Sequence, residues 1–228
     1  MFFTPYGFTG LQYIIPAMIL AFIAQGMVSS AYGRFSKVST RRGTTGYEVA
    51  RRILDMNGLY DVQVVEIGGK LSDHYDPRRR VVRLSSGIFR GSSIASVSVA
   101  AHECGHALQH AKGYVPLTFR SLLAPVVSVT QNFVWVLVVL GVLFSSTGLI
   151  DLGIVFFLGV ILFQMVTLPV EFNASNRAIR LLGDLNVLYE DEVPGARKML
   201  NAAALTYVAA VAMSLAQLMR LLMIRNRD

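Results

Sequence analysis

Four long apolar stretches, separated by polar ones, organise this chain. Residues 1–33 carry no charged side chain, and further uncharged stretches cover residues 121–150, 152–170 and 199–219. A helix needs roughly 20 apolar residues to cross about 30 Å of hydrocarbon. The first three stretches therefore predict transmembrane helices. The fourth is rich in alanine and fits either a membrane span or a buried core helix.

The polar region that follows the first apolar stretch has a mixed pattern. Residues 44–61 carry a helical stripe of apolar positions behind capping threonines, and Gly58 is expected to end that helix. Residues 62–67 alternate and are β-branched, which is typical of a strand, and residues 80–84 predict a second one. Residues 91–113 begin with serine caps and end at a glycine, so they predict a helix of about 20 residues.

The second polar region begins directly after the third apolar stretch. Residues 171–184 predict a helix that is opened by Thr167 and Pro169 and closed by Gly183. The segment at residues 145–151 (SSTGLID) is then expected to form a tight hairpin between the second and third apolar stretches. A hairpin returns the chain to its starting side, so both polar regions are expected on one face of the membrane.

Charge indicates which face that is. Four basic residues follow the first apolar stretch directly, and the positive-inside rule places them in the cytoplasm: Arg34, Lys37, Arg41 and Arg42. Arg225 and Arg227 are discordant, because they would lie outside if the fourth stretch spans the membrane. The first stretch lacks a basic n-region and an A-x-A-like cleavage site, so we expect a retained anchor rather than a secretion signal.

Composition supports the membrane interpretation. Of the 228 residues, 54% are hydrophobic, and the mean hydropathy is +0.51. Only 15% are charged, against about 25% in a soluble domain. The net charge is +7, but the basic residues lie beside membrane segments instead of forming a nucleic-acid-binding face. The single cysteine, Cys104, excludes an internal disulfide framework.

The stretch AHECGHALQH at residues 101–110 contains the pattern His-Glu-x-x-His. His102 and His106 would lie about 6 Å apart along a helix axis and about 40° apart around it. Both imidazoles can then bind one ion at Zn–N distances of about 2.0–2.1 Å. Glu103 lies about 100° further round, where it can take a proton from an attacking water without binding the metal. The alternative is a helix whose histidines are hydrogen-bonded on an inner face.

A catalytic zinc needs a third protein ligand. His110 lies about 12 Å from His102 along the same helix, which is too far for one ion to contact all three histidines. Enzymes with the pattern His-Glu-x-x-His-x-x-Gly-x-x-His bring a third histidine to the ion by breaking the helix at the glycine, and here Gln109 occupies the glycine position. We therefore expect His110 to lie outside the ligand set.

Glu171 is the better candidate for the third ligand. It follows the third apolar stretch and is expected on the same membrane face as His102. A carboxylate beside hydrocarbon is costly and usually has a partner. The alternative role is an interfacial glutamate that pairs with Arg177 or Arg180.

The motif order now resembles a known family. AAHECGH, followed by a two-segment membrane hairpin and then VEFNASNRAI, resembles the YugP-like family of membrane-integrated neutral zinc metallopeptidases. It is distantly similar to HtpX and the CAAX prenyl proteases, and HYDPRRRVVRLSSGIF resembles their edge strand, next strand and lead-in to the active helix. For the YugP-like family the likeness covers nearly the whole chain. The resemblance implies one zinc ion per chain with His102, His106 and Glu171 as ligands, and Glu103 as general base.

The chain departs from the pattern of the distant relatives at one position. Where the distant relatives have an aspartate that supports a ligand histidine, this chain has Ser175, so that support is expected from Ser175, Asn173 or Asn176. A further group must stabilise the oxyanion. The candidates are His74, Tyr75, Tyr207 and Arg177, of which we favour His74 or Tyr75 because they lie on the presumed edge strand.

The expected fold is mostly α-helical and integral to the membrane. It has three to four transmembrane helices and a small zincin-like α+β catalytic domain that contains a short β-sheet. We expect an N-terminal anchor (1–32), a cytoplasmic catalytic domain with the His-Glu-x-x-His helix (33–120), a transmembrane hairpin (121–170), a second catalytic segment with the third zinc ligand (171–200) and a C-terminal helix (201–228).

The expected function is zinc-dependent hydrolysis of peptide bonds by a multi-pass protein of the plasma membrane, with its site facing the cytoplasm. Its partners would be the lipid bilayer and a peptide or membrane-protein substrate lying along residues 73–76, and no nucleic acid. One alternative is a catalytically silent scaffold stabilised by zinc, against which the intact Glu103 argues. A transporter is the other alternative, and the apolar stretches carry no charges in their interiors to support it.

Overall fold

Four long helices account for the four apolar stretches. The computed structural model describes residues 10–226, and within them these helices are α1 (Leu11–Phe35), α5 (Val115–Leu143), α6 (Thr147–Asp184) and α7 (Val193–Arg225). Each is long and apolar enough to cross a membrane. The predicted mostly helical membrane protein is confirmed, and its alanine-rich fourth stretch qualifies as a span. The first nine residues of the predicted anchor, and Arg227, lie outside the described residues.

The prediction that a new helix opens at Thr167 and Pro169 is wrong. Both residues lie inside the single helix α6, where the Thr167 hydroxyl donates back to the carbonyl four residues earlier. Gly183 does not end the helix either. Asn186 takes the left-handed conformation beyond the helix (φ 51°), and it and its successor donate N–H groups to carbonyls of the last turn. Asparagine tolerates this conformation, so no glycine is needed there.

The described residues group into two compact units. One, the apolar unit, contains residues 10–25, 118–168 and 206–226, and the other, the polar unit, contains residues 26–117 and 169–205. The apolar unit has its own core, in which Val134 of α5, Ile150 of α6 and Leu221 of α7 are buried. Large apolar side chains also face outward along these helices, as expected for surfaces in contact with lipid.

The turn between α5 and α6 is tight and lies at residues 144–146, inside the predicted hairpin segment. Asp151, predicted to lie in that hairpin, instead belongs to the first turns of α6. Its carboxylate accepts a hydrogen bond from Nε of Arg225 on α7 at 2.9 Å. The basic residue that disagreed with the charge rule therefore has an acidic partner at its own end of the helices.

The polar unit contains a three-stranded sheet with strand order β1-β3-β2. The strands are β1 (Gln63–Ile67), β2 (His74–Asp76) and β3 (Val81–Ser85). Strand β3 is central, parallel to β1 and antiparallel to β2, which is an edge strand. The short β-sheet that the sequence predicts is thereby confirmed, and the structure shows that it is mixed.

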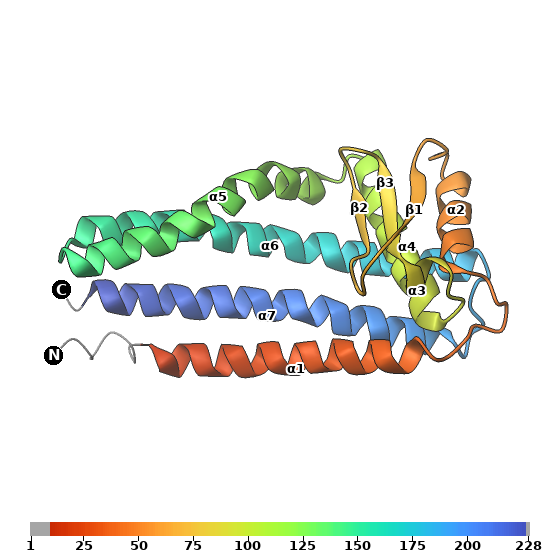
Figure 1. The fold of residues 1–228 in the computed structure, drawn as a ribbon, viewed down its shortest axis with the longest axis horizontal. Helices are drawn as coiled ribbons and strands as arrows, with labels where there is room; N and C mark the ends of the chain where they lie inside the picture. Colours follow the sequence, from red (N-terminus) through yellow and green to blue (C-terminus); the bar gives the residue numbers. More distant parts are fainter. Residues whose placement is uncertain (1–9, 227–228) are drawn as a thin grey trace. The chain divides into compact units, whose positions relative to one another are not determined.

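Three shorter helices complete the polar unit, and Figure 1 shows them grouped with the sheet. They are α2 (Gly46–Met56), α3 (Ser86–Phe89), which the pattern did not predict, and α4 (Ile94–Ala111). Helix α2 begins with a capping box: the Thr45 side chain accepts from the Glu48 N–H, and the Glu48 carboxylate accepts from the Thr45 N–H. Helix α4 packs against α2 and the strands.

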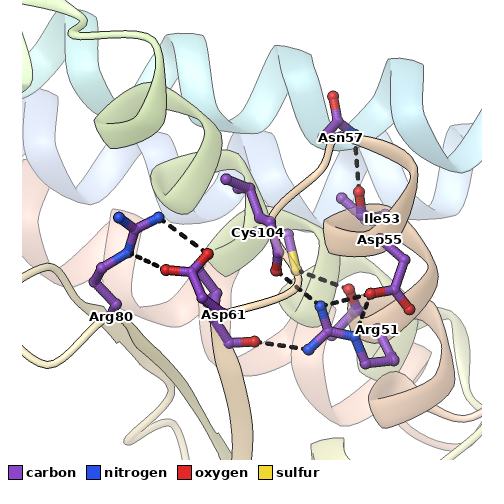
Figure 2. Close-up of polar contacts among 10 residues, drawn as sticks. Arg51, Ile53, Asp55, Asn57, Asp61, Arg80 and Cys104 are labelled. Atoms are coloured by element: carbon purple, nitrogen blue, oxygen red, sulfur yellow. Dashed lines mark hydrogen bonds and ion pairs between the residues drawn. The ribbon is translucent and has the colours of Figure 1, made fainter.

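Polar contacts tie the end of α2 to the strand that follows (Figure 2). The Arg51 guanidinium donates to the carbonyls of Leu59 and Val62 and to the Asp55 carboxylate. These bonds satisfy carbonyls in the connection to β1. Cys104 lies in the resulting core, and burial raises the pKa of its thiol.

Candidate metal centre

Helix α4 carries the His-Glu-x-x-His motif through the middle of the polar unit. Its N-terminus is capped by Ser93, whose hydroxyl accepts from the Ser96 N–H. Small residues dominate its first half, and almost every residue from Ile94 to Gln109 is buried. A helix surrounded by protein must pair its polar side chains, so the polar residues of the motif need partners.

A close approach between two backbones brings Glu171 to this helix. Gly105 lies between the two motif histidines, and a Cβ built on it would lie 2.9 Å from the carbonyl oxygen of Ala174 on α6. No side chain fits in that space without a shift. The glycine thus lets the α6 segment that carries Glu171 lie against the face of α4 that carries His102 and His106.

The ligand atoms of His102, His106 and Glu171 all lie within 4.8 Å of one another. Nε2 of His102 is 3.3 Å from Oε2 of Glu171, and Nε2 of His106 is 3.6 Å from the same oxygen. The two imidazole rings meet edge to face with centroids 4.8 Å apart. Both Nε2 atoms therefore face one carboxylate oxygen, whose side chain is only 3% exposed.

This geometry fits a zinc ion. Two ligands held about 2.0–2.1 Å from a tetrahedral zinc lie about 3.3–3.4 Å apart, and the two histidine–glutamate separations of 3.3 and 3.6 Å are close to this value. The whole set spans up to 4.8 Å, so binding an ion would draw the ligand atoms somewhat closer together. Two imidazole nitrogens and a carboxylate oxygen are also donors that zinc takes in catalytic sites. The structure brings the three predicted ligands together, and their role as ligands and the number of ions per chain stay predictions.

Glu103 lies next to the first histidine and outside the three-residue cluster. Burial raises the pKa of Glu103 to about 7, against the lowering effect of His102, and the negative charges of Glu171 and Asp73 raise it further. The Tyr75 backbone hydrogen-bonds to the carboxylate and opposes that rise. A carboxyl group with a pKa near neutrality can both accept and return a proton at physiological pH.

The predicted supporting residues lie around the cluster. The Ser175 hydroxyl is 3.3 Å from Nδ1 of His102. Oδ1 of Asn173 accepts a hydrogen bond from Nε of Arg177 at 2.7 Å and another from Gln109. Ser175 is thus placed to contact a predicted ligand histidine, while Asn173 contacts Gln109 and Arg177 instead.

The two favoured candidates for the oxyanion contact, His74 and Tyr75, lie on the edge strand β2 and have other partners. His74 is exposed, with Nδ1 2.8 Å from the Ser72 carbonyl oxygen. The Tyr75 hydroxyl is 2.9 Å from Nδ1 of His110. His110 does not belong to the ligand cluster, in line with its distance along the helix. Which group contacts the oxyanion stays a prediction.

Sequence reasoning assigned no role at the site to Gly105 or Gln109. Gly105 occupies a free position of the motif, and only the contact with α6 gives it a purpose. Gln109 was noted solely because it replaces a glycine, although a glutamine three residues after the second histidine could have been read as a polar partner on the same helix face. Gln109 is fully buried beside His106.

Comparison with known proteins shows the family to which the chain belongs. A family model described as "Putative neutral zinc metallopeptidase" matches residues 11–226. The chain belongs to this neutral zinc metallopeptidase family, as the resemblance of its motifs predicted.

A curated relative supports the same conclusion. The chain is 50% identical over 210 residues to the "Putative membrane protease YugP" of Bacillus subtilis (strain 168), which covers 92% of this chain and 93% of the relative. No solved structure matches the chain significantly. The family and the relative both indicate a zinc-dependent protease, and the His-His-Glu cluster fits the zinc. The relative and the four long apolar helices both indicate a membrane location.

Proposed function

We propose that this protein is a membrane-bound zinc metalloendopeptidase in which Glu103 is the general base. One observation carries the proposal: two imidazoles from α4 and one carboxylate from α6 lie within 4.8 Å of one another, and a second buried carboxylate, Glu103, directly follows His102 in the sequence. Membership of a zinc metallopeptidase family supports the same chemistry. A purely structural zinc site would have no need of the Glu103 carboxylate.

His102, His106 and Glu171 would hold the zinc ion, which when bound supplies a Lewis acid for the scissile carbonyl and the attacking water. Glu103 takes a proton from that water as it attacks and then delivers the proton to the leaving amine. The surrounding core excludes bulk water from these groups, so their charges act at short range.

The edge strand β2 supports a proposal for substrate binding. Its backbone contacts Glu103 through Tyr75, and it pairs with β3 on one side only. An extended peptide could add to the other side by backbone hydrogen bonds. The substrate would be a peptide or a segment of a membrane protein, and the basic residues after α1 favour a site that faces the cytoplasm.

The test compares Glu103→Gln with the wild-type protein purified in detergent. We expect the wild-type protein to contain one zinc ion per chain and to hydrolyse fluorescein-labelled casein, an unstructured substrate. The variant should keep its zinc and its melting temperature and lose hydrolysis by about 10²-fold or more. Glu190→Gln, which makes the same chemical change at an exposed position of the polar unit, is the matched control and should behave as wild type.

Two outcomes contradict the proposal in different ways. Loss of zinc from Glu103→Gln means that the carboxylate is a ligand or a structural element rather than a base. A wild-type protein that binds zinc and hydrolyses no more casein than its Glu103→Gln variant would favour the silent zinc-stabilised scaffold.

A further inference from the structure

Gln109 is the most completely buried amide near the candidate metal centre. Its exposed fraction is zero, and its side chain contacts both helices that carry the predicted ligands. We propose that Gln109 is a positioning residue that fixes the tautomer of His106 and links it to the α6 backbone beside Glu171. The inference deepens the proposed function and rests on the zinc site it assigns.

The orientation of the Gln109 amide follows from its partners. Its Nε2 atom lies 2.8 Å from the Val170 carbonyl oxygen, and a carbonyl oxygen can only accept a hydrogen bond. The same nitrogen donates to Oδ1 of Asn173 at 3.0 Å. The atom near α6 must therefore be the nitrogen, and Oε1 must point to His106.

That orientation determines the tautomer of His106. Oε1 of Gln109 lies 3.0 Å from Nδ1 of His106, and an amide oxygen can only accept. Nδ1 must then carry the hydrogen, which leaves the lone pair of a neutral imidazole on Nε2. Nε2 is the atom that faces Glu171 at 3.6 Å. The amide thus presents the correct nitrogen of His106 to the predicted metal position.

The other histidine is held differently. Nδ1 of His102 is 3.3 Å from the Ser175 hydroxyl, which can donate or accept and therefore selects neither tautomer by itself. Of the two contacts, the one from Gln109 is shorter and allows one polarity only. We therefore expect the loss of the Gln109 contact to affect its histidine more than the loss of the Ser175 contact.

The second half of the argument concerns α6. Gln109 donates to the carbonyl of Val170, the residue directly before Glu171, and to Asn173, which also accepts from Arg177. These contacts join α4 to the α6 turn that carries the third predicted ligand. One side chain thus orients a ligand imidazole and holds the neighbouring carboxylate segment in register with it.

The experiment uses three variants of the full-length protein in detergent. Gln109→Met keeps the length of the side chain and removes every hydrogen bond. Gln109→Glu keeps an acceptor for His106 but loses the donor to α6. Ser175→Ala removes the weaker contact to the other histidine and is the matched control.

Three measurements are made on each protein. Zinc affinity is determined by competition with a chelator, and the melting temperature is recorded without zinc. The histidine tautomers of the zinc-free protein are read from ¹⁵N-labelled histidine by nuclear magnetic resonance. The chain has four histidines, which keeps the spectrum assignable.

We expect Gln109→Met to weaken zinc binding by about 10- to 100-fold and to lose the preference of His106 for hydrogen on Nδ1. Gln109→Glu should restore the tautomer of His106 but only part of the zinc affinity, because it loses the donor to α6. Ser175→Ala should weaken zinc binding less than Gln109→Met does. A Gln109→Met protein with wild-type zinc affinity and tautomer would overturn the inference.

A merely structural role gives a different pattern. Gln109→Met would then lower the zinc-free melting temperature without changing the tautomer of His106, and Gln109→Glu would bind zinc no more tightly than Gln109→Met does, which also overturns the inference. If the wild-type protein binds no zinc, the proposed function fails. The tautomer comparison on zinc-free protein still decides whether Gln109 orients His106.

Discussion

Gly105→Ala tests whether the close approach of α4 and α6 assembles the candidate metal centre. The added Cβ would lie 2.9 Å from the Ala174 carbonyl oxygen, while ordinary contacts begin near 3.4 Å, so the two backbones must separate by about 0.5 Å. Zinc–ligand distances tolerate only about ±0.2 Å. The variant should therefore relax by moving Glu171 away from His102 and His106.

The magnitude follows from the cost of overpacking. Inserting one methyl group into a packed core costs about 1–3 kcal/mol, which corresponds to a melting temperature lower by about 2–12 °C for a chain of this size. If the zinc-free variant relieves that strain by separating the helices, zinc binding must restore the close approach. The cost of about 1–3 kcal/mol is then taken from the free energy of zinc binding, which lowers the zinc affinity by about 5- to 150-fold.

The assay is chelator competition for zinc affinity, combined with thermal unfolding of zinc-free protein in detergent. Gly183→Ala is the matched control: it adds the same methyl group on α6, where a Cβ meets nothing within 4 Å, and should keep zinc affinity unchanged. A Gly105→Ala protein that binds zinc as tightly as wild type would refute the reasoning, because it would mean that the helices are not held together at this contact.

Three further predictions concern other parts of the chain. His110→Ala should keep zinc and most hydrolytic activity, because His110 lies outside the ligand cluster; loss of metal would contradict that placement. Thr45→Ala removes the capping box and should lower stability by about 1 kcal/mol in thermal unfolding, and an unchanged melting temperature would argue against the cap. On a Cys104→Ala background, a cysteine at Ser146 should react only from outside intact cells and one at Arg79 only from inside; labelling of both from one side excludes the hairpin topology.

Local pattern was enough to predict the long apolar stretches as helices and to predict the histidine pair. Long uncharged stretches predict membrane helices because hydrocarbon tolerates few charges over about 20 residues. His102 and His106 lie on one helix, so their separation follows from helix geometry alone. The start of α6 at Pro169 was predicted wrongly, because a proline that usually opens a helix is tolerated inside a long apolar one, where only one backbone hydrogen bond is lost.

The sequence by itself determined the membrane-length helices, the strands at residues 62–67 and 80–84 and the spacing of His102 and His106, because each depends on neighbours along the chain. Only the tertiary structure decided which atoms meet across elements. Gly105 has a role because a backbone carbonyl of α6 lies against it, and Gln109 has one because it contacts His106 and Val170 at once. The partners of Gly105 and Gln109 on α6 lie 61 or more residues further along the chain, and no local periodicity can predict a contact over such a separation.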